Sequence, residues 1–182
     1  MNAQTLYQTA IKFATLKHVA INQKVPGTDL PYVVHLSNVA MEVMMANANT
    51  ENFNVALAIQ AALLHDTIED TDTTFSEVEE NFGLDVANAV MALTKNESLP
   101  KEEQMMDSLQ RIKKMPHEVW AVKLADRITN LQAPPSHWDN AKKKKYRAEA
   151  QIILDELASG NVFLADRLQM LIEDYRKYIS ND

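Results

Sequence analysis

An all-α fold is predicted for this chain by its composition and its patterning. Only three of the 182 residues are glycine, and residues that favour helices, such as alanine, leucine, lysine and glutamate, are abundant. Apolar residues recur at helical spacing along most of the chain, and no segment has the pattern of a confident strand. No internal repeat or linker interrupts the sequence. We therefore expect a single domain over residues 1–182, built from about eight to ten helices.

The N-terminal part of the chain is predicted to contain three helices. The first covers residues 3–18, and the polar segment 19–31, which contains proline, glycine and asparagine, is expected to be a loop. A second helix is expected over residues 37–48, with Ser37 as its N-cap. The third covers residues 57–70, where an almost purely apolar half runs into polar residues without a turn signal.

Six further helices are predicted in the rest of the chain. Gly83, the pair Pro134–Pro135 and Gly160 mark boundaries between them, because glycine and proline end helices. The expected helices cover residues 75–82, 84–94, 101–114, 116–132, 138–158 and 161–179.

Composition excludes several classes of function. The chain has no cysteine, so disulfides, Fe–S clusters and thiolate zinc sites are ruled out, and a reducing cytoplasm fits. A net charge of −7 argues against a broad nucleic-acid surface, and the basic run 142–145 is expected to be a solvated helix face. The N-terminus lacks the pattern of a signal peptide, and no run approaches the roughly 20 apolar residues that span a membrane. No pattern in the sequence predicts an oligomeric state.

The third predicted helix carries the strongest chemical signal. Its apolar half is followed by His65, Asp66, Glu69 and Asp70. Buried charges need a partner, a proton or a metal ion. On a continuous helix, residues four apart share a face, so His65 would lie above Glu69 and Asp66 above Asp70. A compact set of nitrogen and oxygen donors facing a core is suited to a catalytic metal.

Two more residues are candidate ligands for the same metal. His35 is at the start of a predicted helix, and Asp126 lies within the apolar helix over residues 116–132. Either residue has an ordinary alternative: a lone histidine is more often simply hydrogen-bonded, and Asp126 could pair with Lys123 or Arg127. The three helices together favour a metal site made by His35, His65, Asp66 and Asp126.

Several motifs, taken in order, resemble a known family. They are PYVVH (31–35), AALLHDTIEDT (61–71), FG (82–83), TK (94–95), LPK (99–101) and VKLADRITNL (122–131). The pattern H…HD…D resembles the HD-domain metal-dependent phosphohydrolases, and the surrounding motifs resemble the hydrolase domain of the RelA/SpoT homologues. Because the resemblance spans roughly residues 5–178, the chain looks like a free-standing small alarmone hydrolase with a single HD-domain helical bundle.

The resemblance implies an activity and a set of roles. It implies Mn²⁺-dependent removal of the 3′-pyrophosphate from ppGpp or pppGpp, which gives GDP or GTP and pyrophosphate. It places the metal on His35, His65, Asp66 and Asp126. It gives Glu69 and Asp70 the handling of the attacking water, which agrees with the general ability of a nearby carboxylate to orient water and accept its proton.

Residues that hold the nucleotide are also implied. The family positions map onto Lys24 in the 19–31 loop, Asn130 after the last metal ligand and Tyr146 on the following helix. Lys95 and Lys101 are further candidates for phosphate contacts. Arg127 is instead expected to brace Asp126 through a salt bridge. For each of these side chains, the alternative is an ordinary surface position.

The loop before His35 departs from the family pattern, which usually reads KHxGQxRKxG before PYxxHP. Ala20, Ile21 and Gln23 stand where glycine, glutamine and arginine are usual, the loop is longer, and Leu36 replaces proline. A lost arginine near the nucleotide leaves other substrates open, namely pppApp, NADPH or a dNTP. A catalytically silent nucleotide-binding domain is a further alternative, against which all six motif carboxylates and histidines argue.

Overall fold

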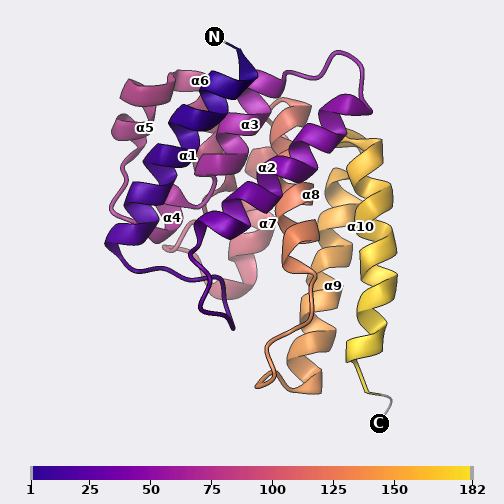
Figure 1. The fold of residues 1–182 in the computed structure, drawn as a ribbon. Coiled ribbons are helices and arrows are strands. Elements are labelled where there is room, and N and C mark those ends of the chain that lie inside the picture. The colour runs from indigo at the N-terminus through magenta and orange to yellow at the C-terminus, as the bar shows by residue number, and fades with distance from the viewer. Residues whose placement is uncertain (1, 181–182) are drawn as a thin grey trace.

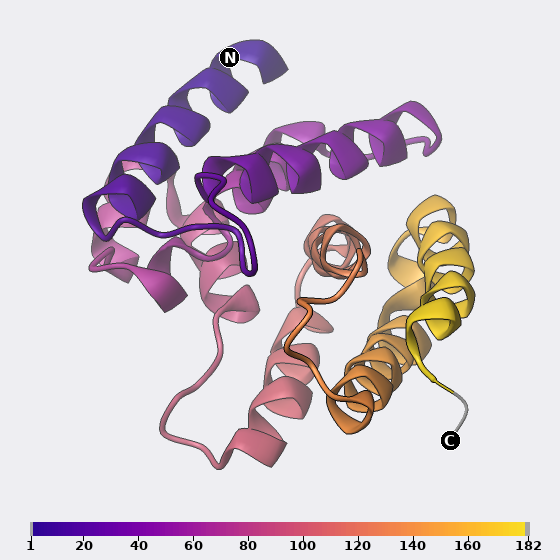
Figure 2. The same ribbon diagram turned by 60° about the horizontal axis from the view of Figure 1, so that its bottom comes forward.

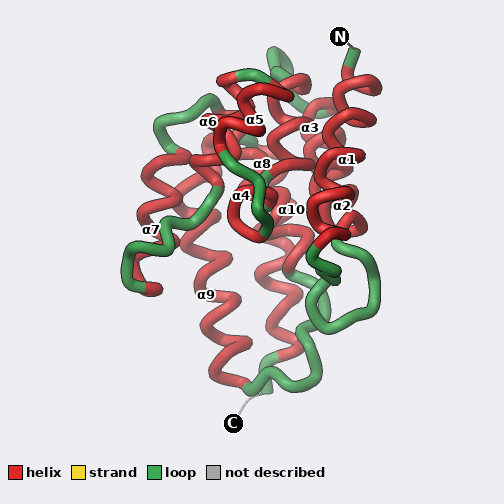
Figure 3. The backbone as a smooth tube through the Cα atoms, turned by 90° about the vertical axis from the view of Figure 1, so that its left-hand side faces the viewer, coloured by secondary structure: helices red, strands yellow, loops and turns green. Residues whose placement is uncertain are grey.

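The computed structural model describes residues 2–180, and these are almost entirely helical (Figure 1). The only β pairing in this part of the chain is an isolated bridge between Lys24 and Pro31, and the tube in Figure 3 shows helices and loops alone. The all-α prediction is confirmed. The helices are α1 (Ala3–Ala20), α2 (Val33–Ala48), α3 (Val55–Leu64), α4 (Thr67–Asp70), α5 (Phe75–Phe82), α6 (Leu84–Leu93), α7 (Lys101–Ile112), α8 (His117–Asn130), α9 (Asn140–Leu157) and α10 (Val162–Asp174), with 3₁₀ turns at Ala158–Gly160 and Tyr175–Tyr178.

Helices α3 and α8 form the centre of the packing. Every residue of α3 from Leu57 to Leu64 is buried, and α3 contacts α1, α2, α6 and α8. Figure 2 shows α8 nearly end-on, between α2 on one side and the antiparallel pair α9 and α10 on the other. The ends of α3 and α8 that carry polar residues are therefore enclosed by other helices. In residues 2–180, no helix is both long enough and apolar enough to cross a membrane.

Helix α2 begins four residues earlier than the sequence analysis expects. Its first residue is Val33, directly after the N-cap Tyr32, and Ser37 lies within the helix. Pro31 explains the difference, because its carbonyl accepts a hydrogen bond from the Val34 N–H at 3.0 Å and starts the first turn. The Ser37 hydroxyl lies 3.2 Å from the Tyr7 hydroxyl instead of capping the helix. His35 consequently lies in the first turn of α2.

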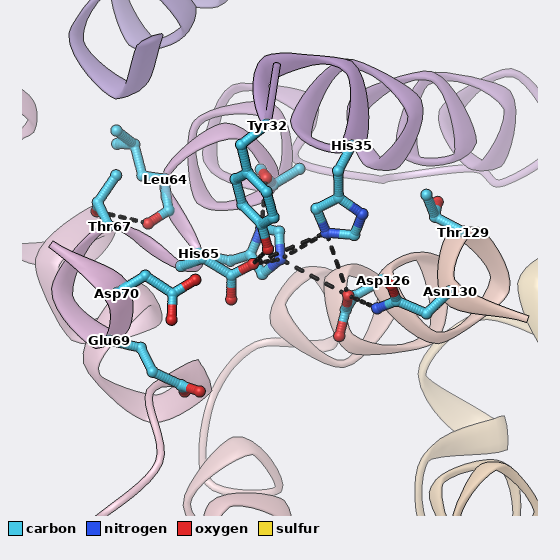
Figure 4. Close-up of polar contacts among 12 residues, drawn as sticks. Tyr32, His35, Leu64, His65, Thr67, Glu69, Asp70, Asp126, Thr129 and Asn130 are labelled. Carbon is cyan, nitrogen blue, oxygen red and sulfur yellow. Dashed lines mark hydrogen bonds and ion pairs between the residues drawn. The ribbon is translucent and has the colours of Figure 1, made fainter. Parts of the chain in front are cut away.

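The expected continuous helix through Asp70 is wrong. Helix α3 ends at Leu64, and α4 covers only Thr67–Asp70. Asp66 leaves ideal helical geometry, with φ −100° and ψ −1°. The Thr67 hydroxyl donates to the Leu64 carbonyl at 2.7 Å, so a side chain takes an acceptor that a continuous helix would give to a backbone N–H (Figure 4). The break re-aims the two adjacent side chains of His65 and Asp66.

Candidate metal centre and catalytic site

Three buried side chains from three helices converge on one point. The ligand atoms of His35, His65 and Asp126 all lie within 4.8 Å of one another. The two Nε2 atoms of the histidines are 3.4 Å apart. The Asp126 Oδ1 atom lies 3.5 Å from Nε2 of His35 and 3.7 Å from Nε2 of His65 (Figure 4). Helices α2 and α8 and the residue that follows α3 therefore each direct one donor to the same centre.

Asp66 is the fourth side chain at this centre. Its Oδ2 atom is 2.9 Å from Nε2 of His65 and 3.8 Å from Nε2 of His35. The Tyr32 hydroxyl donates a hydrogen bond to the same carboxylate oxygen. Tyr32 is buried, and its ring lies against that of His35, with centroids 5.1 Å apart. The sequence does not predict this role of Tyr32, because nothing in the motif PYVVH shows that its hydroxyl reaches a carboxylate 34 residues later.

Hydrogen bonds from outside the centre orient its donors. The His65 Nδ1 atom lies 2.8 Å from the Ala62 carbonyl, which makes Nδ1 a donor and turns Nε2 toward the other ligands. The Asn130 amide donates to Asp126 Oδ1 at 2.6 Å, and the Lys123 ammonium donates to Oδ2 at 3.0 Å. Two carboxylates and two imidazoles oriented in this way fit a divalent cation.

Burial and mutual charge govern the ionisation of the cluster. Burial opposes the charged form of His65, but Asp66 and Asp126 outweigh it and raise the pKa of His65 well above its usual value. Burial also opposes ionisation of the two carboxyl groups. Even so, His65 lowers the pKa of Asp66, and Lys123 lowers that of Asp126, below the usual range. Both carboxylates are thus held ionised, which is the form that binds a metal ion.

Comparison with protein families identifies this arrangement. Residues 10–161 match the model of the HD domain family. The chain belongs to the HD domain family. The resemblance that the motifs indicated is thereby confirmed, and a divalent metal site is the feature that this family and the His/Asp cluster share.

Several relatives of this HD domain have a named activity. A protein of Danio rerio, named guanosine-3′,5′-bis(diphosphate) 3′-pyrophosphohydrolase MESH1, is 36% identical over 166 residues, which cover 88% of this chain and 89% of the relative. The Homo sapiens protein of the same name is 34% identical, with 90% and 91% covered. A solved structure described as a metazoan ortholog of SpoT that hydrolyzes ppGpp aligns with a TM-score of 0.79 and 29% identity, covering 96% of this chain and 97% of that one.

The two acidic residues beyond the metal cluster have different partners. Both oxygens of the Glu69 carboxylate are engaged by Lys95: the Lys95 backbone N–H donates to Oε2 at 2.9 Å, and its ammonium donates to Oε1. Asp70 accepts one hydrogen bond, from the Gln23 amide at 2.8 Å. The Gln23 carbonyl is in turn 2.6 Å from Nδ1 of the buried His18. Partial burial raises the pKa of Asp70, whereas Glu69 is held in an ion pair by Lys95.

The five predicted substrate-binding residues fall into separate places. Asn130 and Tyr146 line a pocket of about 340 Å³, together with His35, Trp138 and the 25–30 loop. Burial raises the pKa of Tyr146 to about 12, so its hydroxyl remains protonated. Lys95 and Lys101 line a different cleft. Lys24 is exposed on the loop beside the first pocket.

Arg127 does not make the salt bridge to Asp126 that the sequence analysis expects. Its guanidinium lies over the ring of Tyr146, 4.5 Å from the centroid, while Lys123 takes the position next to Asp126. Helical geometry explains the outcome. Lys123 is three residues before Asp126 and shares its face, whereas the residue directly after Asp126 points to another side.

Proposed function

We propose that this protein is a Mn²⁺-dependent hydrolase that removes the 3′-pyrophosphate from ppGpp or pppGpp and gives GDP or GTP and pyrophosphate. The observation that carries the proposal is the cluster of His35, His65, Asp66 and Asp126, with the pocket of about 340 Å³ that reaches His35. Relatives that align over about nine tenths of their own length are named for this reaction.

The four ligands would hold the metal ion, which when bound lowers the pKa of water and neutralises phosphoryl oxygens. Asp70 accepts a proton from the attacking water, because its single hydrogen bond from Gln23 leaves a carboxylate oxygen available. The water oxygen forms a bond to the phosphorus next to the ribose, and the bond from that phosphorus to the ribose 3′ oxygen breaks. The ribose oxygen takes up a proton, and pyrophosphate leaves with the oxygen of the water.

The remaining residues position the substrate. The pocket of about 340 Å³ is in the size range of small-molecule sites, roughly 300–1,000 Å³, and it reaches His35. Its walls include Trp138 and Tyr146, which offer aromatic surface to a base or ribose. Lys24 is exposed and directly precedes Val25, which lines this pocket, so its charge can meet a phosphate of the same nucleotide. Asn130 holds Asp126, so its first task is to orient a ligand of the metal.

The presence of Gln23 where arginine is usual is the reason to consider a second substrate. The usual arginine would bring a positive charge to the nucleotide, but both ends of the Gln23 amide are engaged by His18 and Asp70. The second candidate is therefore a phosphohydrolase of the same class that acts on pppApp, NADPH or a dNTP, where the missing arginine would change base or phosphate recognition.

A side-by-side assay tests the proposal. The purified protein is incubated with Mn²⁺ and equal concentrations of ppGpp, pppGpp, pppApp, NADPH and dNTPs, and the products are separated by chromatography. We expect ppGpp and pppGpp to yield GDP and GTP with stoichiometric pyrophosphate, and EDTA to abolish the reaction. If ppGpp stays intact while another nucleotide is cleaved, the substrate assignment is wrong. If none is cleaved, the assignment as a hydrolase of this class fails.

A further inference from the structure

A second cleft beside the metal cluster is lined by an unusual number of cations. Helices α7, α8 and α9 meet on the side of α8 that faces away from α2 (Figure 2). The cleft between them has a volume of about 150 Å³. We call it the basic cleft, after the four cationic side chains in its wall: Lys95, Lys101, Lys123 and Arg127. Lys95 and Lys123 are paired with Glu69 and Asp126, so Lys101 and Arg127, for which no carboxylate partner is present among the described residues, carry the uncompensated positive charge.

The single carboxylate in this wall does not neutralise it. Glu149 lines the basic cleft, and its Oε1 atom lies 3.9 Å from the ammonium of Lys145, which is outside the cleft. The other polar members, Gln104 and Ser108, are neutral. The positive charge of the basic cleft therefore favours the binding of an anion.

Two of the four cations join the basic cleft to the catalytic site. Lys123 donates to Oδ2 of Asp126, while the two histidines lie against Oδ1 of the same carboxylate. Lys95 donates to Glu69. The pocket that contains His35 and Trp138 does not share a lining residue with the basic cleft. The metal cluster thus has the larger, aromatic pocket on its His35 side and the basic cleft on its Lys123 side.

Arg127 supplies an independent sign that an anion is expected here. Its Nε and Nη1 atoms are buried and have no hydrogen-bond partner among the described residues. The ring of Tyr146 covers one face of the guanidinium and fixes its position. Buried donors without an acceptor are costly, and guanidinium groups are well suited to pair with phosphate oxygens.

We propose that the basic cleft binds a diphosphate group, namely the pyrophosphate that leaves the nucleotide. The inference rests on the proposed function and adds to it the place of the leaving group. The volume of the cleft, about 150 Å³, is less than half that of the pocket of about 340 Å³ beside His35, so the cleft suits the smaller and more highly charged end of the substrate. With the nucleoside on the His35 side, the 3′-pyrophosphate spans the metal cluster and its terminal phosphate reaches Lys101 and Arg127.

Product inhibition separates the two ends of the substrate. The Mn²⁺-loaded protein is assayed with ppGpp at constant free Mn²⁺, with either inorganic pyrophosphate or GDP as the inhibitor. Lys101→Met removes one charge of the cleft at an exposed position that has no contact with the metal ligands. We expect the inhibition constant for pyrophosphate to rise about tenfold and that for GDP to change less than twofold. Lys101→Arg, which keeps the charge, should restore pyrophosphate inhibition.

A matched variant and a binding measurement complete the test. Lys114→Met makes the same substitution at an exposed position just after α7, outside the cleft, and should change neither constant. If Lys101→Met weakens GDP and leaves pyrophosphate unchanged, the cleft binds the 5′-diphosphate and the proposal is overturned. If the wild-type protein does not hydrolyse ppGpp, calorimetric titration with pyrophosphate still tests the cleft. Equal affinity in the wild type and Lys101→Met would then refute it, separately from the failure of the proposed function.

Discussion

Glu69 and Asp70 are adjacent in the chain, yet the structure gives them different chemical environments. Lys95 engages both oxygens of Glu69 through its backbone N–H and its ammonium. Asp70 has one amide donor and a raised pKa, caused first by burial and then by the charges of Asp66 and Glu69. The sequence motif alone treats the two carboxylates alike, and only their partners distinguish them. Asp70 is therefore the residue whose titration should govern the rate.

The pH dependence of the reaction follows from this environment. A general base acts in its ionised form, so kcat/KM should fall as the pH drops through the pKa of Asp70. The Gln23 amide donates to the ionised form and lowers that pKa, as does His18 from the other side of Gln23. Gln23→Leu removes the donor, so the pKa of Asp70 should rise. We expect the acidic limb of the kcat/KM profile to move to higher pH, with the plateau at high pH retained.

The control for this profile is Ile21→Ala, an exposed change in the same loop, which should leave the limb in place. An unmoved limb in Gln23→Leu would show that a group other than Asp70 is titrating. A loss of rate at every pH would instead indicate that Gln23 contacts the substrate.

At the scale of elements, local signals were sufficient to place most helices but not to place the break in one of them. Apolar periodicity and turn residues predict α5, α6 and α9 within a few residues of their observed ends, because these signals act over neighbouring residues. The break after Leu64 depends on the Thr67 hydroxyl and on a carboxylate held by Tyr32 from another helix. Residues 65–70 favour a helix by themselves, so no local pattern predicts that α3 ends at Leu64.

The same distinction applies to the residues of the site. The positions His35, His65, Asp66 and Asp126 were found because their motifs are short and characteristic, and the structure brings all four together. The partners of these residues depend on contacts between distant segments, such as Tyr32 with Asp66 and Lys95 with Glu69. Lys123 could have been chosen over Arg127 from helical spacing alone, since residues three apart lie on one face.

Gly160 determines how closely α8 approaches the turn before α10. Gly160 is buried, and a Cβ atom at this position would lie 2.5 Å from Cβ of Trp120 and 3.1 Å from two atoms of its ring. A contact with Cβ cannot be relieved by rotating a side chain, so the helices must separate. Gly160→Ala should destabilise the protein by about 1–3 kcal/mol, as overpacking does. At 2–4 °C per kcal/mol for a chain of this size, Tm should fall by about 2–12 °C.

Ser159→Ala is the matched change, because Ser159 is the exposed neighbour of Gly160. Thermal unfolding followed by circular dichroism should show little shift in that variant. A Tm of Gly160→Ala equal to that of the original protein would mean that α8 and the turn can separate without cost, and that the close approach is not required.

At the scale of the whole molecule, the metal cluster is the point where three parts of the chain are connected. His35 is on α2, His65 and Asp66 follow α3, and Asp126 is on α8, which itself contacts α9 and α10. Without a cation, His65 and Lys123 hold the two carboxylates of this site in their ionised form. A divalent ion bound by these side chains would link the three segments, so it should stabilise the fold and not only the site.

The size of this stabilisation can be predicted from linkage. A ligand that binds only the folded state at a hundredfold excess over its Kd stabilises by about 2.7 kcal/mol. For a chain of this length, Tm should therefore rise by roughly 5–10 °C when Mn²⁺ is added to metal-free protein, and EDTA should reverse the rise.

Asp126→Ala removes a ligand from α8 and should lose the Mn²⁺-dependent rise in Tm together with activity. Glu69→Ala, beyond the cluster, should keep the rise while its turnover falls. If Mn²⁺ raises Tm equally in Asp126→Ala and in the original protein, the ion binds elsewhere, because the loss of a ligand should reduce the stabilisation.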